Sequence, residues 1–203
     1  MKLRNTCLKP KGHNLEKGIA LLIVIIVMAF VLTIGVALLT VTSTGPKVAG
    51  NIRDQQEAFN AAEAGFDVGW TAIGDFFAKG SWSSFEGHYL KEPYGIDMPS
   101  SKENYFRRLS DLGILKLIDP DGDGKSNLDN VLFYRQAYIT NFQGQLDTQY
   151  TYTVFLVDDE SGSAASDSSD ALMVCIGCIK AGSSTSTSRL EIGLAIELPG
   201  ANT

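Results

Sequence analysis

The sequence predicts an α+β fold in which a long N-terminal hydrophobic α-helix packs on a four-stranded antiparallel β-sheet domain. Three observations predict it: residues 19–41 form an apolar run, residues 46–77 show an amphipathic helical pattern, and four strand-like segments follow one another between residues 131 and 198. We therefore divide the chain into an N-terminal leader at 1–18, a long helix at 19–77 and a globular α+β head at 78–203.

The apolar run is long enough to cross a membrane. Of its 23 residues, 20 are apolar, the exceptions being Thr33, Gly35 and Thr40. As a helix it would be about 35 Å long, more than the roughly 30 Å of a hydrocarbon core. The 18 preceding residues carry five basic side chains and one acidic one. This excess predicts a cytoplasmic N-terminus and an exported head. An apolar region of about 7 to 15 residues is typical of a cleaved secretory signal, so an uncleaved signal anchor is the stronger alternative.

The second part of the predicted helix has one apolar stripe. Pro46 follows Gly45, and we expect this pair to kink the helix or melt one turn. Beyond it, apolar residues recur in steps of three, four and seven, which indicates a helix with one buried face. We expect this stripe to pack on the head; it consists of Ile52, Phe59, Ala62, Phe66, Trp70, Ile73 and Phe77.

The head is expected to be an antiparallel meander preceded by a short helix. Strand-like runs occupy residues 131–139, 148–157, 171–179 and 189–198. The stretches 141–145, 158–170 and 181–188 have turn or loop compositions. Ser100 and Glu103 resemble a capping box, so we predict a helix from Ser100 to about Leu112 that ends at Gly113.

An acidic loop between residues 119 and 130 is the strongest local motif. Oxygen ligands at its first, third and fifth positions, glycine at its sixth and a carbonyl at its seventh match the front half of an EF-hand-like calcium loop. Position 12 is an asparagine where a bidentate glutamate is expected, which weakens affinity or changes the geometry. A solvated acidic turn is the alternative. The candidate Ca²⁺ ligands are Asp119, Asp121, Asp123, Lys125 through its carbonyl, Asn127 and Asn130.

A second acidic cluster, formed by Asp158, Asp159, Glu160, Asp167 and Asp170, lies in a serine-rich segment. Its composition favours a solvated loop over a metal site.

The cysteines allow two interpretations. Cys175 and Cys178 lie in a predicted strand, where residues three apart are about 10 Å apart and on opposite faces. A disulfide needs Cα atoms about 4.4 to 6.8 Å apart, so it would require a bulge, which Gly177 would supply. The alternative is a pair of free buried thiols. A redox-active pair needs a helix N-terminus at the first cysteine, and a zinc site would need two further ligands.

Several functions are disfavoured. The chain has 17 basic and 23 acidic residues and lacks a basic tract, which argues against a nucleic-acid partner. It shows neither a nucleotide-binding glycine-rich loop after a strand nor a nucleophile elbow. His88 is the one histidine after the leader, and nothing in the sequence places a serine beside it. We therefore expect no enzymatic activity.

The junction between the leader and the apolar run resembles a type IV prepilin leader. The sequence Lys17-Gly18-Ile19-Ala20-Leu21-Leu22 joins a basic leader that ends in glycine to an uninterrupted apolar helix. The resemblance implies that a prepilin peptidase cuts between Gly18 and Ile19 on the cytoplasmic side, after which the new N-terminal residue is methylated. Cys7 would leave with the leader, and the net charge would change from −6 to 12 − 22 = −10.

The segment after the apolar run resembles the N-terminal region of PilX-type minor pilins. An Ala-Gly-Asn leads through a basic residue into an Ala-Phe-x-Ala-Ala-Glu-Ala-Gly block. The matching residues are Ala49, Gly50, Asn51, Arg53, Ala58, Phe59, Ala61, Ala62, Glu63, Ala64 and Gly65. Most pilins have a glutamate at the fifth mature position, whereas this chain has Ile23. That departure argues against a major, repeating subunit.

The resemblance implies a type IV pilin-like fold and a bacterial minor pilin. It would be a single-pass inner-membrane protein before assembly and part of an extracellular pilus afterwards, where it would prime or tip the filament. Its partners would be other pilins, through the N-terminal helix, and the prepilin peptidase. Three alternatives remain open: a type II secretion pseudopilin, a signal-anchored calcium-binding protein that does not polymerise, and a membrane-tethered thiol oxidoreductase.

Overall fold

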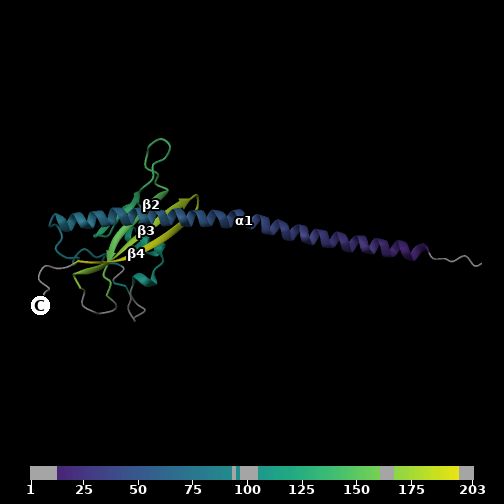
Figure 1. Ribbon diagram of the computed structural model, residues 1–203, viewed down its shortest axis with the longest axis horizontal. Coiled ribbons are helices and arrows are strands. Elements are labelled where there is room, and N and C mark those ends of the chain that lie inside the picture. The colour runs from purple at the N-terminus through teal and green to yellow at the C-terminus, as the bar shows by residue number, and fades with distance from the viewer. Residues whose placement is uncertain (1–12, 93–94, 97–104, 161–166, 197–203) are drawn as a thin grey trace, which may run out of the picture. The chain divides into compact units, whose positions relative to one another are not determined.

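The computed structural model describes residues 13–92, 95–96, 105–160 and 167–196, and it contains one long helix, two short helical segments and four strands (Figure 1). In chain order these are α1 (His13–Ala78), the 3₁₀ helix η1 (Phe106–Arg108), α2 (Asp111–Ile118), β1 (Val131–Ala137), β2 (Tyr150–Val157), β3 (Asp170–Ala181) and β4 (Ser184–Ala195). The chain forms two compact units, residues 1–50 and residues 51–203.

Within the first unit, residues 19–41 of α1 are apolar on all sides. The large side chains from Ile19 to Val41 are exposed in the isolated chain, and the helix is long and apolar enough to cross a membrane. The two threonine hydroxyls between Ile19 and Val41 are satisfied within the helix. Thr33 donates to the carbonyl oxygen of Ala29 at 2.7 Å, and Thr40 donates to that of Val36 at 2.7 Å. The segment can therefore enter hydrocarbon without an unpaired threonine hydroxyl.

The backbone of α1 remains helical through Gly45 and Pro46. The melted turn expected at this pair is therefore not formed. Pro46 has no N–H to donate to the carbonyl one turn earlier, but helical φ/ψ values continue on both sides. The boundary between the two compact units falls four residues later, between Gly50 and Asn51.

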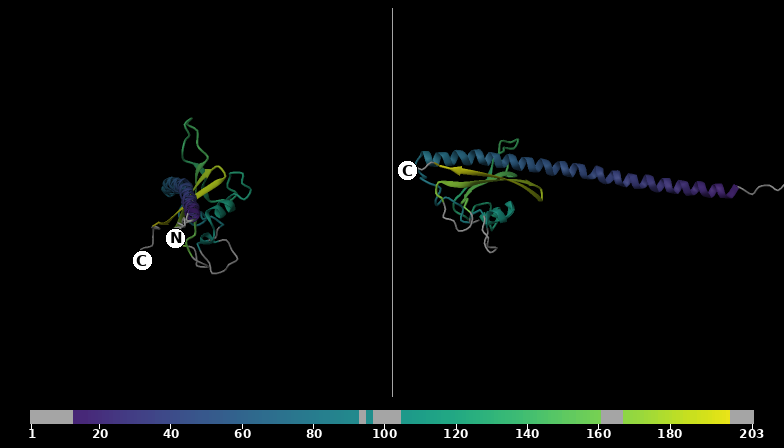
Figure 2. Two further views of the ribbon diagram at one scale, coloured as in Figure 1. Left: turned by 90° about the vertical axis from the view of Figure 1, so that its right-hand side faces the viewer. Right: turned by 60° about the horizontal axis from the view of Figure 1, so that its bottom comes forward.

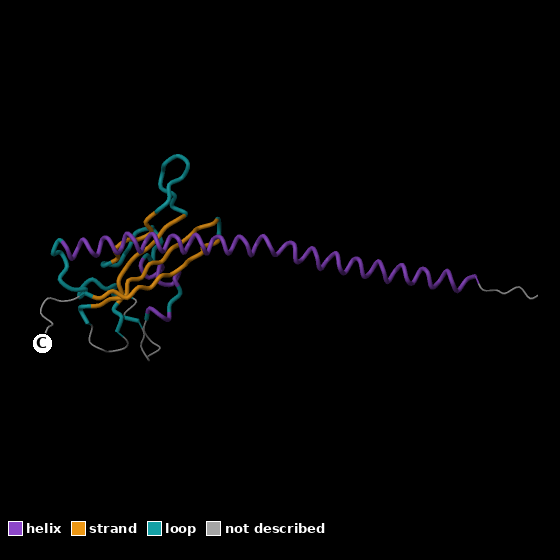
Figure 3. Tube along the Cα trace, viewed as in Figure 1, coloured by secondary structure: helices purple, strands orange, loops and turns teal. Residues whose placement is uncertain are grey.

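The four strands form the predicted antiparallel meander in the order β1-β2-β3-β4 (Figure 3). β2 and β3 pair without interruption from Tyr150↔Ile179 to Val157↔Leu172, whereas β1 pairs with β2 through two register shifts. β4 begins earlier than expected, because residues 184–188 pair with β3 instead of forming a loop. A tight turn at Gly182, whose φ is +61°, joins β3 to β4.

The two central strands are buried on both faces. On one face, Tyr152, Val154 and Leu156 of β2 form a core with Ala62 and Ile73 of α1. On the other face, Phe155 and Val157 pack with α2 and η1 (Figure 2). Alternate residues of β2 therefore point into two different hydrophobic cores, one on each face of the sheet.

The short helix before the sheet lies later than predicted. The proposed cap at Ser100 and Glu103 falls outside the described residues, whereas α2 begins after Ser110, whose Oγ accepts a hydrogen bond from the N–H of Gly113 at 3.2 Å. Gly113 therefore lies inside the helix instead of ending it. The sequence reading missed this cap because Ser110 lacks the glutamate three residues later that completes a capping box.

Candidate functional site

The closest contact between α1 and the sheet is made by small residues. Ala58, Ala61 and Ala62 are fully buried. A Cβ added to Gly177 of β3 would lie 1.9 Å from the carbonyl oxygen of Ala58 and 2.5 Å from the nitrogen of Ala62. Only glycine allows backbones to come this close. The alanine-rich block of the sequence is therefore the surface on which α1 rests against its own head.

The predicted apolar stripe packs on the head in part, since Phe66 and Phe77 are partly buried against the core beneath α1. Ala62 and Ile73 are buried, but Ile52, Phe59 and Trp70 are 52%, 42% and 58% exposed. The helix has turned its small residues toward the sheet, because a glycine in β3 permits an approach that bulky side chains would prevent. Periodicity located the helix and part of its buried face, because Ala62, Phe66, Ile73 and Phe77 belong to or pack against the core. It missed the buried Ala58 and Ala61.

The acidic loop is organised around Asp119, which follows α2 directly and is 4% exposed. Its Oδ1 accepts a hydrogen bond from the N–H of Gly122 at 2.7 Å, and its Oδ2 accepts one from the N–H of Gly124 at 3.1 Å. The Tyr134 hydroxyl of β1 also donates to Oδ2, at 2.8 Å, and Nη1 of Arg135 lies 3.9 Å from the same oxygen. Sequence reasoning missed both β1 residues, because no local pattern relates them to the loop.

These contacts set the ionisation of the two side chains. Burial raises the pKa of Asp119, but hydrogen bonds from Tyr134 and from the two glycine N–H groups outweigh it and hold this pKa below its ordinary value. Burial and the Asp119 carboxylate raise the pKa of Tyr134. Asp119 is therefore a carboxylate at neutral pH.

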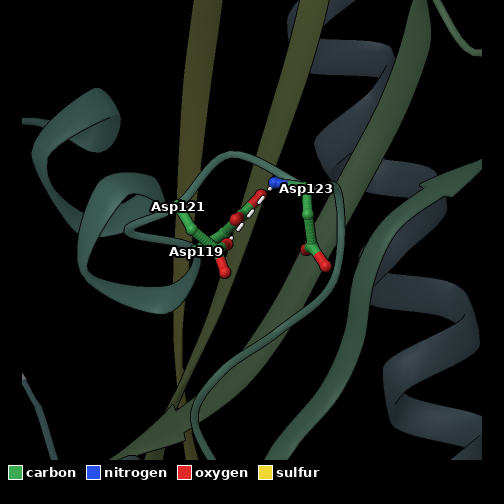
Figure 4. A group of neighbouring side chains, drawn as sticks. All are labelled: Asp119, Asp121 and Asp123. Carbon is green, nitrogen blue, oxygen red and sulfur yellow. Dashed lines mark hydrogen bonds between the residues drawn. The ribbon is translucent and has the colours of Figure 1, made fainter.

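The carboxylates of Asp119, Asp121 and Asp123 gather on one side of the loop between α2 and β1 (Figure 4). Each offers one oxygen, and these oxygens lie within 4.8 Å of one another. Gly124, at the sixth position, has a φ of +86°, as the sharp turn of a calcium loop requires. The amide of Asn127 lies beside the same group, with Nδ2 3.5 Å from Oδ2 of Asp121. Lys125 and Asn127 thus follow the three carboxylates around the turn.

Asn130 does not join this group. Its Nδ2 donates to the carbonyl oxygens of Gly87 at 2.9 Å and Tyr89 at 3.0 Å, and its backbone has a φ of 67°. The expected twelfth ligand therefore connects β1 to the loop after α1. Its left-handed backbone is one that asparagine tolerates better than most residues, which explains an asparagine here without a metal.

The second acidic cluster is less solvated than expected. Asp158, Asp159 and Glu160 are half-buried, and one oxygen each of Asp159, Glu160 and Asp170 is buried without a hydrogen-bond partner among the described residues. A hydrogen bond with Asp158, together with burial, raises the pKa of Glu160 to about 7.

Cys175 and Cys178 are free thiols on opposite faces of β3. β3 pairs in continuous register with both neighbouring strands, so the bulge that a disulfide would need at Gly177 is not formed. Cys175 belongs to the core beneath α1, where burial raises its pKa to about 12. Gly177 instead serves the close approach of α1, a role that an isolated glycine in a strand pattern can signal.

His88 is packed against an aromatic ring. Its imidazole stacks on Trp82 with 3.9 Å between ring centroids, and burial lowers its pKa. Trp82 in turn stacks on Phe76 near the end of α1. These contacts give His88 a packing role.

Comparison with known proteins bears on the N-terminal quarter of the chain. Residues 17–67 match the family model described as PilX N-terminal. No curated protein and no solved structure gives a significant match. The matched residues include Lys17 and Gly18, the apolar part of α1 and the small residues that rest on β3. This is a family of structural pilins and not of enzymes. The N-terminal quarter of the chain is therefore similar to the N-terminal region of PilX-type pilins, and this match supports a PilX-type pilin assignment.

Proposed function

We propose that the chain is a minor pilin, made as an inner-membrane prepilin and cut by prepilin peptidase between Gly18 and Ile19. The observation that carries the proposal is the family match over residues 17–67, which covers a helix with exposed apolar side chains from Ile19 to Val41. Such a surface needs lipid or other apolar helices around it. A membrane would cover it before assembly, and other pilin helices would cover it in a filament.

The fifth residue of the mature chain supports a position at the filament tip or at rare sites along it. Ile23 stands where most pilins have a glutamate that pairs with a neighbouring N-terminal amine. A charged amine buried without such a partner is costly in a low-dielectric surrounding. A subunit of this kind is best tolerated where few neighbours enclose its N-terminus, as in priming or tipping a filament.

Processing is tested by the mass of the N-terminal peptide of the protein isolated from its native membranes. We expect methylated Ile19 in the unmodified chain and an intact leader in a Gly18→Leu variant. Gly35→Leu is the matched control, because Gly35 lies in open space in the same helix. Intact Met1 in the unmodified chain would refute processing and favour the signal anchor.

The position in the filament needs a separate experiment. Immunogold labelling of the head should mark ends or sparse points of the filaments. Uniform labelling along the shaft would contradict the minor role, and labelling confined to cell envelopes would favour a secretion pseudopilin or a protein that does not polymerise.

We also propose that the loop at 119–127 binds Ca²⁺. The support is the set of three clustered carboxylates, the left-handed Gly124, and a lone pair that remains on Oδ1 of Asp119, which accepts one hydrogen bond. The Lys125 carbonyl and the Asn127 side chain would be further ligands. Ca²⁺ takes about 6 to 8 oxygens, so water would complete the shell, since Asn130 is engaged elsewhere. Such a site is expected to bind weakly.

Calorimetric titration of the full chain with Ca²⁺ tests this site. We expect the heat of binding to disappear in Asp121→Asn/Asp123→Asn, which leaves the buried Asp119 and its bond to Tyr134 in place. Asp129→Asn is the control, because it removes one exposed charge from the same loop. An unmodified chain that shows neither heat nor a rise in melting temperature would refute calcium binding here.

A further inference from the structure

A polar pocket of the head lies beside the acidic loop. It is lined by residues of α2, of that loop and of all four strands, and its volume is about 470 Å³. This volume lies within the range of about 300 to 1,000 Å³ that is usual for small-molecule sites. Among the described residues that line the pocket, Arg135 and Lys180 are basic and none is acidic. The pocket therefore has the opposite charge to the chain as a whole, which has 17 basic and 23 acidic residues.

Arg135 reaches this pocket from an irregular part of β1. The register of β1 against β2 shifts between Phe133 and Gln136, and the backbone of Arg135 has a φ of 45°. This left-handed conformation is unfavourable for a long side chain, and such strain is concentrated at functional sites. A bulge also changes the direction of a side chain. The result of the irregularity is a guanidinium group that lines the pocket.

The hydrogen-bond donors of the two basic side chains are available to a ligand. In the described part of the chain, the Lys180 ammonium group has neither a hydrogen bond nor an ion pair. Nη1 of Arg135 lies 3.9 Å from Oδ2 of Asp119, which is longer than a hydrogen bond. Its guanidinium group also lies over the Tyr134 ring, 5.4 Å from the ring centroid. A guanidinium group has five N–H donors, and these two contacts use none of them.

The two positive charges act on the same point of the pocket. Burial raises the pKa of Cys178, which also lines the pocket, whereas the charges of Arg135 and Lys180 oppose this shift. Both charges therefore lie close enough to the Cys178 side chain to stabilise an anion beside it.

The other lining residues divide into an apolar and a polar group. Leu112 and Leu115 of α2 supply apolar side chains, and Leu112 is 51% exposed. Thr148, Gln149 and Thr185 supply hydroxyl and amide groups. A ligand that fits this lining has an apolar part and further polar atoms next to its negative charge.

We propose that the pocket binds a small organic acid in which one carboxylate is attached to an apolar group. The guanidinium fork of Arg135 matches a carboxylate through two parallel hydrogen bonds, and Lys180 adds a second positive charge. The carboxylates of Asp119, Asp121 and Asp123 in the adjoining loop repel anions, so a singly charged carboxylate is favoured over a doubly charged phosphate. Neither leader cleavage nor bound Ca²⁺ is needed for this binding, so its test is independent of both functions proposed above.

Titration of the full chain with N-acetyl-leucine tests the pocket. The chain is held in a non-ionic detergent with a calcium chelator, and the methyl NMR signals of leucine and threonine are followed. We expect saturable shifts at Leu112, Leu115 and Thr185. The affinity for N-acetyl-leucinamide, which has a similar shape without the charge, should be at least about tenfold lower. Inorganic phosphate should also bind more weakly than N-acetyl-leucine.

Three variants separate binding in the pocket from general charge attraction. We expect Arg135→Gln and Lys180→Gln each to lower the affinity for N-acetyl-leucine about tenfold. Both residues are exposed, so the substitutions should preserve the fold, which melting temperatures would check. Lys116→Gln is the matched control, because Lys116 is an exposed basic residue of α2 outside the pocket lining, and it should change the affinity less than about twofold.

The contradicting results are equally specific. The inference would be overturned if N-acetyl-leucine gave no saturable shift, if its shifts were confined to residues outside the pocket, or if the neutral amide or phosphate bound as tightly. Unchanged affinity in both Arg135→Gln and Lys180→Gln, or an equal loss in Lys116→Gln, would also overturn it.

Discussion

The two parts of helix α1 use apolar residues in opposite ways. From Ile19 to Val41, large side chains cover all sides of the helix, and the chain itself buries none of them. From Ala58 to Ile73, the buried face is made of alanine and glycine with one large residue, and bulkier side chains lie to the side. Large side chains form a surface that lipid or other molecules must cover. Small residues allow a fixed intramolecular contact in which two backbones approach closely.

The comparison implies that glycines in the two parts differ in importance. Gly35 has nothing within 4 Å of an added Cβ, whereas Gly69 would place that atom 2.9 Å from Cγ1 of Val154 and 3.2 Å from the sulfur of Met173. A larger residue can therefore replace Gly35 in the apolar part without a clash, whereas the packing of α1 on the head requires a glycine at position 69.

The largest effect is expected at the strand partner of the close contact. Gly177→Ala must push α1 away from β3, because the new Cβ would meet backbone atoms that cannot rotate aside. We expect the free energy of unfolding to fall by about 3 kcal/mol or more, measured by denaturant unfolding. Gly193→Ala in β4 is the control, since its Cβ would enter open space. Similar stability of the two variants would show that α1 does not rest on Gly177.

A smaller loss is expected on the helix side. Gly69→Ala meets flexible side chains instead of backbone, so neighbouring atoms can shift, and we expect a loss of about 1 to 3 kcal/mol. Gly35→Ala should leave the unfolding of the head unchanged. Equal effects of Gly69→Ala and Gly35→Ala on the midpoint of head unfolding would contradict the proposed difference between the two parts of α1.

The pH dependence of unfolding should come from the head alone, because no ionisable residue lies between Lys17 and Lys47. The pKa of Glu160 is raised in the folded state to about 7 from an ordinary value of about 4.5. The folded protein therefore retains a proton that the unfolded chain releases, and stability falls as pH rises from about 4.5 to about 7.

We expect Glu160→Gln to reduce this fall, because the substituted side chain stays neutral across the interval. Melting temperatures measured at pH 4.5, 6 and 7.5 for both proteins would show it. If the melting temperature of the unmodified chain instead rises across this interval, and rises as much as that of the variant, Glu160 does not cause a fall in stability. Asp119 acts in the opposite sense, since its lowered pKa gives stability that is lost only as pH falls below about 4.

The smallest effect is expected at the exposed apolar residues of the head helix. Trp70 is 58% exposed, so Trp70→Ser should change the free energy of unfolding of the isolated chain by about 0.5 kcal/mol or less. Ile73→Ala, three residues away and buried, should cost about 2 to 5 kcal/mol. Thermal unfolding of the two variants compares them directly, and a large loss at Trp70 would show that this exposed residue of the stripe also stabilises the head.

The helix, the meander and the family were predictable because each depends on local pattern. Apolar runs and alternation identify α1 and β2, and the alanine-rich block identifies the family segment. The close approach of α1 to β3 at Ala58 and Ala62 was not predictable, because it depends on Gly177, more than a hundred residues away in the chain. The acidic loop shows the same division: spacing found Asp119, Asp121 and Asp123, but only the fold shows that Asn130 bonds to the loop after α1.

The head and its part of α1 should form a complete folding unit that needs nothing from the apolar part of the helix. A fragment of residues 51–203 corresponds to that unit. We predict that it is soluble and unfolds within about 2 °C of the head transition of the full chain in detergent, equivalent to less than about 1 kcal/mol. A fragment that is unfolded, or that melts more than about 10 °C lower, would show that residues 19–50 stabilise the head and would contradict the account.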